Sequence, residues 1–219
     1  MRIGIVIRTY NERRHLSEVL AGVARQVVEN HLVRTIVVDS GSNDGTPEIA
    51  MQADCEVLHV PKSEFSFGRS LNLGCEALDA DIVAFLSGHC IPVQEDWLAK
   101  LIAPILQEKA VLTYGRQIGH SSTRFSERRI FEKYFPLESQ IPQRELFCNN
   151  ANAAILAPIW REYKYDETVT GLEDLHMAKR LLADGLQLAY VAEAPVVHIH
   201  QESWLRVKNR FEREAIALQ

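Results

Sequence analysis

Polar side chains that could bind a nucleotide stand at the ends of three apolar runs. The runs cover residues 3–7, 35–39 and 82–86, and they lead to Thr9, Tyr10 and Glu12, to Asp39, and to Ser87-Gly88-His89. An aromatic ring offers a flat face to a base, and a carboxylate accepts hydrogen bonds from a base or a ribose. Each residue also has a purely structural alternative. Asp39 could cap the following turn, Glu12 could stabilise the first turn of a helix, and Tyr10 could pack against other side chains.

An acidic pair, Glu173-Asp174, stands where a helix over residues 173–183 is predicted to begin. A carboxylate beside an acceptor hydroxyl can take its proton as the oxygen attacks a reaction centre. Acidic residues in a first helical turn are also favoured by the helix dipole. Position alone therefore leaves both roles open for these two residues.

Histidines offer a second kind of chemistry. His198 and His200 are separated by one residue on a predicted strand, so their side chains share one face of it. Together with His89, one of them could form a nitrogen-rich site for manganese or another transition metal, or could bind phosphate when protonated. A pair of structural histidines is the alternative.

These residues are positioned by alternating strands and helices. The apolar run 3–7 predicts a strand covered on both faces, and the segments 35–39, 56–60 and 82–86 predict three further strands. Helices are predicted over 16–27, 46–52 and 68–78, with Asn11 as the cap of the first. Such alternation predicts an α/β fold with a Rossmann-like, mostly parallel sheet flanked by helices. Neither the GxGxxG fingerprint nor the GxxxxGK[ST] phosphate loop is present, which disfavours hydride transfer and ordinary ATP chemistry.

The second half of the chain is less regular. We expect a helix over 97–105, strands at 111–115, 153–156, 186–191 and 196–199, and a mobile loop over 117–124. A last helix over 203–219 has an apolar stripe on one face and Arg206, Arg210 and Arg213 on the other. No linker divides the chain, so we expect one domain over 1–219, with a nucleotide-binding half of about 1–115 and an acceptor-side half of about 116–219.

Composition excludes several classes of protein. With 24 Lys and Arg against 29 Asp and Glu, the net charge of −5 gives no broad attraction to nucleic acid. The apolar runs are far shorter than the roughly 20 residues that span a bilayer, so we expect a cytoplasmic protein. The four cysteines lack any CxxC spacing, which predicts free and mostly buried thiols.

Three motifs occur in the order typical of family 2 glycosyltransferases. They are Thr9-Tyr10-Asn11-Glu12, the segment Val37 to Thr46, and Gly171-Leu172-Glu173-Asp174. The chain resembles this family from residue 1 to about residue 215. The segments Glu64 to Gly74 and Tyr114 to Gln117 are most similar to its rhamnosyltransferase-like branch. The resemblance implies the GT-A fold and transfer of a sugar from a nucleotide diphosphate donor, with inversion at the anomeric carbon.

The resemblance also implies roles for single residues. Asp39 would bind the nucleotide with Thr9, Tyr10 and Glu12, Asp174 would be the general base, and Glu173 would orient the acceptor. A late histidine would lie near the metal or the diphosphate. The chain departs from the family where Ser87-Gly88-His89 replaces the acidic metal site, which puts a divalent cofactor, Mn²⁺ or Mg²⁺, in question. It departs again at Leu71, where relatives carry an Arg before the residue matching Asn72, and Arg69 could supply that cation.

The sequence therefore predicts an inverting glycosyltransferase that uses a nucleotide-sugar donor and a glycan or lipid-linked acceptor in surface polysaccharide synthesis. Rhamnose from a dTDP donor is the expected sugar. The basic face of the last helix could contact the inner face of the membrane, and its apolar stripe could form a homodimer. The rival hypothesis is a nucleotide-sugar-binding pseudoenzyme that lost the acidic metal site. A nucleotidyltransferase is disfavoured because residues 8–13 contain no glycine.

Overall fold

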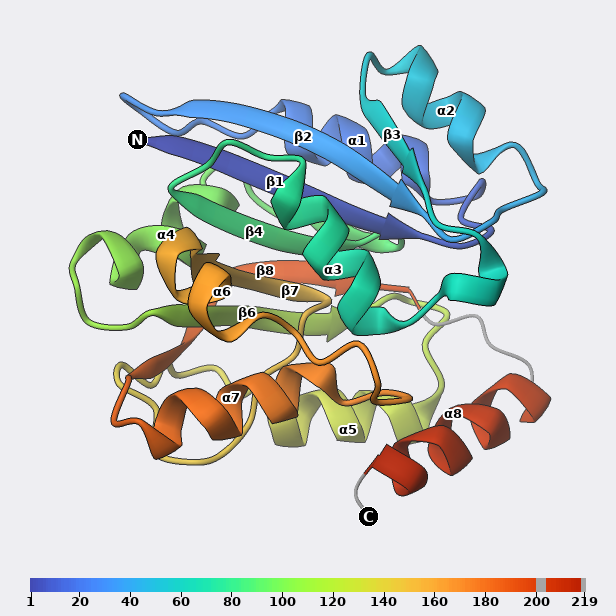
Figure 1. The fold of residues 1–219 in the computed structure, drawn as a ribbon. Helices are drawn as coiled ribbons and strands as arrows, with labels where there is room; N and C mark the ends of the chain where they lie inside the picture. Colours follow the sequence, from blue (N-terminus) through green and yellow to red (C-terminus); the bar gives the residue numbers. More distant parts are fainter. Residues whose placement is uncertain (200–203, 218–219) are drawn as a thin grey trace.

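The computed structural model describes residues 1–199 and 204–217, without the side chain of Arg206. Figure 1 shows a curved sheet with helices on both faces. The strands are β1 (Arg2–Thr9), β2 (Leu32–Asp39), β3 (Glu56–His59), β4 (Ile82–Ser87), β5 (Cys90–Pro92), β6 (Leu112–Gly119), β7 (Asn152–Leu156) and β8 (Leu188–His198). The helices are α1 (Leu16–Ala24), α2 (Thr46–Gln52), α3 (Phe67–Glu76), α4 (Trp97–Leu106), α5 (Phe125–Tyr134), α6 (Ala157–Tyr163), α7 (Glu173–Ala183) and α8 (Trp204–Ala217).

Within the described residues all strands join one sheet, in the order β3-β2-β1-β4-β7-β6-β8-β5. The pairs β3–β2, β2–β1, β1–β4 and β6–β8 are parallel, whereas β4–β7, β7–β6 and β8–β5 are antiparallel. The predicted α/β fold with a mostly parallel sheet is confirmed. Because β7 runs against β4, its first residues lie at the carboxyl ends of β1 and β4, where ligands bind in such sheets.

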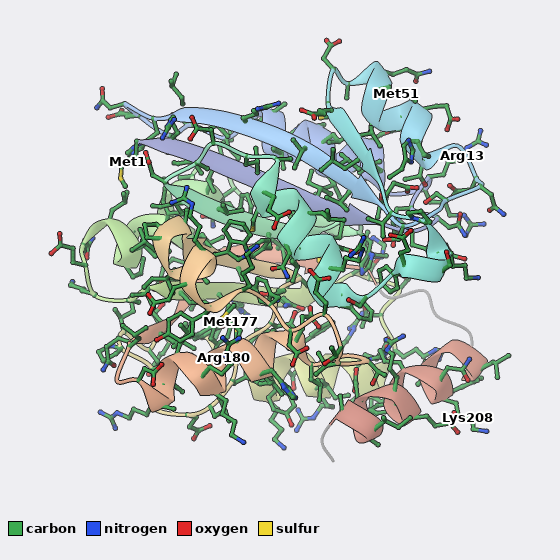
Figure 2. The ribbon with its side chains drawn as sticks, viewed as in Figure 1. Met1, Arg13, Met51, Met177, Arg180 and Lys208 are labelled. Carbon is green, nitrogen blue, oxygen red and sulfur yellow. The ribbon has the colours of Figure 1, made fainter. Side chains whose placement is uncertain are left out.

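Each face of the sheet carries its own apolar core. Val6 of β1 packs with α3, α6 and α7, whereas its neighbours Ile5 and Ile7 pack with α1 and α4. Burial on both faces explains why these strands read as unbroken apolar runs. The helices are placed by their buried faces: Met177 of α7 is buried in the first core, while Lys208 of α8 points outward (Figure 2).

Several predicted elements are wrong in the second half. Residues 117–119 continue β6 instead of opening a mobile loop, because the side chain of Gln117 is buried and hydrogen-bonded. The two strands predicted at 186–191 and 196–199 are one strand, β8, paired with β6 across an irregularity between Gly115 and Gln117. The short strand β5 and the helices α5 and α6 were not predicted. In α5 the sequence signal is weak because Phe131 is the one buried residue of that helix.

The remaining structural predictions concern cysteines and membrane spans. The thiols of Cys55, Cys75, Cys90 and Cys148 are free, as expected, and the last three are buried. Among the described helices none combines the length and the apolar character that a membrane crossing requires.

Candidate active site

The carboxyl ends of β1 and β2 are joined through Asp39. Thr9 lies opposite Asp39 in the parallel ladder, and its hydroxyl donates to Asp39 Oδ1 at 3.0 Å. Asp39 Oδ2 accepts from the backbone N–H groups of Gly41 and Ser42, at 3.1 and 2.9 Å. The carboxylate is 1% exposed, so it holds the loop after β2 in place at the edge of the sheet.

The loop after β1 leaves the ring of Tyr10 accessible. Asn11 adopts a left-handed backbone, with φ of 57°, and its side chain accepts from the backbone N–H of Asn43 at 3.0 Å. Asn11 therefore ties the two loops together and does not cap α1, which begins after His15. Tyr10 remains 44% exposed, with the Lys62 ammonium 5.8 Å from its ring centre. An exposed ring beside a cation fits a base and an adjoining phosphate.

The acidic pair lies at the start of α7 and is connected to β1. Arg8, the neighbour of Thr9, donates to Glu173 Oε1 at 3.3 Å. Asn150 joins the two acids, since its side chain donates to Glu173 Oε1 at 3.4 Å and its backbone N–H donates to Asp174 Oδ2 at 3.2 Å. Two consecutive residues of β1, Arg8 and Thr9, thus contact Glu173 and Asp39 at the end of that strand.

The surroundings of Asp174 raise its pKa into the range that suits a general base. Glu173 and Asp174 are both buried, at 4% and 8% exposure. Burial and the charge of neighbouring Glu173 raise the pKa of Asp174 from 3.8 to about 7, against the opposing effect of the backbone hydrogen bonds from Asn150 and Leu175. With its pKa raised to about 7, Asp174 exchanges a proton near neutral pH. A carboxyl with that pKa can accept a proton efficiently at neutral pH.

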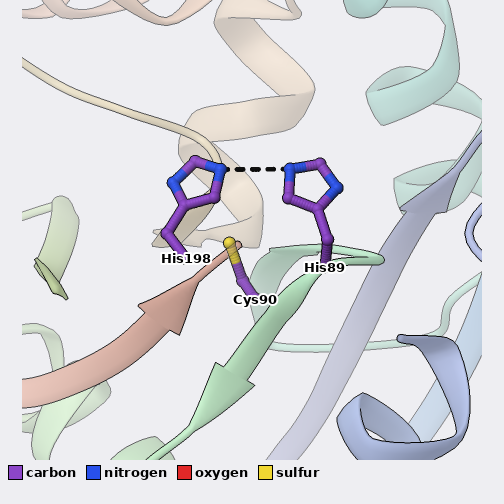
Figure 3. Close-up of side chains that lie close together, drawn as sticks. All are labelled: His89, Cys90 and His198. Carbon is purple, nitrogen blue, oxygen red and sulfur yellow. Dashed lines mark hydrogen bonds between the residues drawn. The ribbon is translucent and has the colours of Figure 1, made fainter. Parts of the chain in front are cut away.

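His89 and His198 face each other near the ends of β4 and β8. Their Nε2 atoms lie 3.0 Å apart, and Figure 3 shows both rings above the Cys90 thiol. His89 Nδ1 lies 2.6 Å from Glu12 Oε1, and His198 Nδ1 lies 2.5 Å from Gln117 Oε1. Both partners accept hydrogen bonds, so each Nδ1 carries a proton. The two Nε2 atoms face each other, at a distance where one proton or one metal ion can lie between them.

This arrangement fits a transition-metal ion. Metal-binding histidines usually donate their second N–H to a carboxylate or carbonyl, as these two do. Burial raises the pKa of the Cys90 thiol well above its usual range, so Cys90 stays protonated and is a poor ligand. Magnesium prefers oxygen ligands, whereas imidazole nitrogens suit a transition metal such as manganese better. His200, the third predicted histidine, lies outside the described residues.

Arg69 and Asn72 of α3 contact protein groups in the structure. The Arg69 guanidinium forms ion pairs with Glu64 at 2.8 Å and with Glu167 at 3.4 Å. Asn72 is buried, and its Oδ1 accepts from Trp160 Nε1 and from the backbone N–H of Tyr165, both at 3.0 Å. Its amide donates to the Tyr165 carbonyl and to Glu167, so the hydrogen-bonding capacity of Asn72 is used within the protein.

Sequence reasoning missed Arg8, Gln117 and Asn150. Arg8 directly follows the apolar run 3–7, and its single charge was the only sign in the sequence of a functional role. Asn150 belongs to the unusual series Asn149, Asn150 and Asn152 before β7, and such a run of amides could have marked a polar network. That network joins the histidines to the acids, because Gln117 donates to Asn149 Oδ1 at 2.9 Å, next to Asn150.

The fold, which has an acidic pair at the start of a late helix, is that of GT-A glycosyltransferases. A sequence profile described as "Glycosyl transferase family 2" matches residues 4–162. The chain belongs to this family.

Known proteins similar to this chain agree with that class. The O-antigen chain rhamnosyltransferase RfbN of Salmonella typhimurium is 27% identical over 213 residues, which cover 91% of this chain and 67% of RfbN. The mannosyltransferase PcManGT of Pyrobaculum calidifontis, solved with GDP-Man and Mn²⁺, superposes with a TM-score of 0.74 at 17% identity, covering 99% of this chain and 61% of PcManGT. TarS of S. aureus, solved with UDP-GlcNAc, has a TM-score of 0.73 at 15% identity, over 93% of this chain and 60% of TarS. The chain thus spans about two thirds of the length of these relatives or less.

Proposed function

We propose that the chain is an inverting glycosyltransferase that moves a sugar from a nucleotide diphosphate donor to a hydroxyl of a glycan or lipid-linked acceptor. The observation that carries this proposal is the buried Asp174 at the start of α7, whose pKa is raised to about 7 and whose neighbour Glu173 is bonded to Arg8 on β1. Residues of about 1–115 hold the nucleotide, through Asp39, Thr9, Tyr10 and Glu12, and about 116–219 hold the acceptor.

In the proposed reaction Asp174 takes the proton of the acceptor hydroxyl. The oxygen attacks the anomeric carbon from the face opposite the diphosphate, the bond from that carbon to the diphosphate breaks, and the configuration inverts. Glu173, held by Arg8 and Asn150, orients the acceptor and keeps a negative charge beside Asp174. The proton ends on Asp174, and the bonding electrons leave with the nucleoside diphosphate.

The charge on the leaving group has to be balanced. A manganese ion, when held by His89 and His198, would supply positive charge at the diphosphate. The fit of the two imidazoles supports this, and PcManGT was solved with Mn²⁺. Glu12 and Gln117 orient the rings, so Glu12 serves the histidine pair as well as the nucleotide loop.

The relatives support a particular donor and setting. The name of RfbN, an O-antigen chain rhamnosyltransferase, supports rhamnose as the sugar and a surface polysaccharide as the product. We place the reaction in the cytoplasm, at the inner face of the membrane, with a homodimer as the expected assembly.

The competing function is a nucleotide-sugar-binding pseudoenzyme. It is favoured by one observation, the segment Ser87-Gly88-His89, which stands where the family resemblance implies an acidic metal site. The acidic pair with its raised Asp174 pKa argues against it, since binding alone needs no base.

A donor panel tests the proposal. Melting temperatures would be recorded with dTDP, UDP and GDP, each with and without manganese, because a ligand that binds the native state raises them. The protein would then be incubated with the matching nucleotide sugars and a polyprenyl diphosphate-linked acceptor. We expect stabilisation by one nucleotide, release of that diphosphate and a product of inverted anomeric configuration by NMR. Stabilisation without any turnover would favour the pseudoenzyme, and a retained configuration would contradict inversion.

A further inference from the structure

Two arginines from distant parts of the chain meet on one aromatic ring. Phe67 is the first residue of α3, and the Arg8 guanidinium carbon lies 5.4 Å from the centre of its ring. The Arg213 guanidinium carbon, from α8, lies 4.8 Å from the same centre. One side chain therefore gathers two positive charges from β1 and α8.

In the described part of the chain, neither guanidinium has a hydrogen-bond partner for every one of its nitrogen atoms. The Nε atoms of Arg8 and Arg213 are both buried and have no hydrogen-bond partner among residues 1–199 and 204–217. Arg8 bonds to Glu173 at 3.3 Å, which is longer than the usual 2.7–2.9 Å between charged groups. Stacking on an aromatic ring occupies the face of a guanidinium and leaves the N–H groups of its edge for another ligand.

The position of this arginine pair is next to the proposed base. The Thr170 hydroxyl donates to the backbone carbonyl of Arg213 at 3.2 Å, and a Cβ on Gly171 would lie 3.6 Å from Arg213 Nε. Arg213 thus lies against the segment that leads directly into Glu173. Within the described residues Arg213 has no carboxylate within ion-pair distance, so the pair carries more positive charge than Glu173 balances.

We propose that Arg8 and Arg213, stacked on Phe67, form a binding site for a diphosphate group of a substrate. This inference rests on the proposed function, in which the donor is a nucleotide diphosphate sugar and a lipid-linked acceptor also carries a diphosphate. Two planar guanidiniums match the paired oxygens and the multiple negative charge of such a group. They would supply positive charge to the diphosphate in a chain where Ser87-Gly88-His89 replaces the acidic metal site that the family resemblance implies.

The test compares Arg213→Gln with Lys208→Gln by titration calorimetry. Both substitutions remove one positive charge from α8, but Lys208 is exposed and pairs with Glu212 on the same helix. The probes are inorganic pyrophosphate, the nucleoside diphosphate that stabilises the wild type most, and geranyl diphosphate as a soluble stand-in for the lipid. Arg213→Lys keeps the charge but not the planar fork, and melting temperatures check that each variant folds.

We expect Arg213→Gln to weaken pyrophosphate binding by about 10- to 100-fold, Arg213→Lys to weaken it less, and Lys208→Gln to leave it unchanged. A parallel loss for the nucleoside diphosphate assigns the site to the donor, whereas a parallel loss for geranyl diphosphate assigns it to the acceptor. Wild-type protein that does not bind pyrophosphate, or equal affinities in Arg213→Gln and wild type, would overturn the site.

The outcome is separable from that of the proposed function. If no nucleoside diphosphate binds the wild type but pyrophosphate binding still depends on Arg213, the anion site stands and the glycosyltransferase proposal fails. If turnover is observed and Arg213→Gln binds every probe as tightly as the wild type does, the glycosyltransferase proposal stands and the anion site fails.

Discussion

At the scale of single residues, the chemistry depends on the different hydrogen-bond partners of two neighbouring acids, Glu173 and Asp174. Glu173 receives hydrogen bonds from Arg8 and from Asn150, whereas Asp174 receives backbone N–H groups. The pKa of Asp174 is raised by burial and by the charge of Glu173. A buried carboxyl whose pKa is raised into the neutral range by burial and by a neighbouring acid is suited to act as a general base.

The raised pKa of Asp174 predicts how turnover depends on pH. Asp174 acts only when deprotonated, so kcat/KM rises with pH through about 7 in the wild type. Glu173→Gln removes the negative charge next to Asp174 and leaves Arg8 beside it, so the pKa of Asp174 falls. We expect the rising limb of the pH profile to move to lower pH. A limb that stays in place, or that moves to higher pH, would show that another group titrates.

The sequence predicted Asp174 but could not predict its pKa. The acid was visible because it opens a helix and lies in a family motif, whereas its burial depends on packing against Asn150 and the end of β1. Arg8 was missed because an apolar run that ends in one charge reads as the end of a strand. Only the folded contact between β1 and α7 shows that Arg8 approaches Glu173.

At the scale of elements, α3 is fastened to the segment between α6 and α7 by Asn72. This side chain satisfies Trp160 Nε1 and the backbone of Tyr165, all of them buried. The same segment leads to the start of α7, so the bonds of Asn72 help to fix where the acidic pair lies.

Two substitutions on α3 separate structure from ligand binding. Asn72→Ala leaves buried donors without partners, so we expect the free energy of unfolding to fall by about 2–4 kcal/mol. Arg69→Gln breaks only exposed ion pairs, and its effect should stay below about 1 kcal/mol. Urea denaturation gives both values, and calorimetry with the nucleoside diphosphate gives the affinities. A stable Asn72→Ala protein with lost nucleotide affinity would instead place Asn72 in the nucleotide site, as the sequence predicted.

The elements also show where sequence patterns are informative. Strands β1 and β4 were predictable because both of their faces are buried and their central runs, 3–7 and 82–86, are wholly apolar. The extension of β6 was not, because Gln117 is a buried polar residue whose bonds to His198 and Asn149 replace water. Helix α5 was missed because it buries Phe131 alone and is otherwise polar.

At the scale of the whole molecule, the free energy of unfolding depends on the protonation of Asp174. Its pKa is near 3.8 in the unfolded chain and about 7 in the folded one, so between these values the folded state binds more protons. The free energy of unfolding therefore falls as pH rises from about 4 to about 7, and the cost persists above that range.

Asp174→Asn should remove this dependence. We expect the variant to be more stable than the wild type above pH 7 and to lose the part of the pH slope that Asp174 contributes between about pH 4 and pH 7. Denaturation at a series of pH values measures both. A variant that is less stable than the wild type at pH 8 would show that ionised Asp174 stabilises the fold and would contradict the raised pKa.

The central claim is that Asp174 is the base of a sugar transfer from a bound nucleotide. The direct measurement is the transfer rate of Asp174→Asn beside its affinity for the nucleoside diphosphate that binds the wild type. We predict a loss of about 10²–10⁴-fold in rate with an unchanged dissociation constant. Transfer at the wild-type rate by Asp174→Asn would contradict the claim.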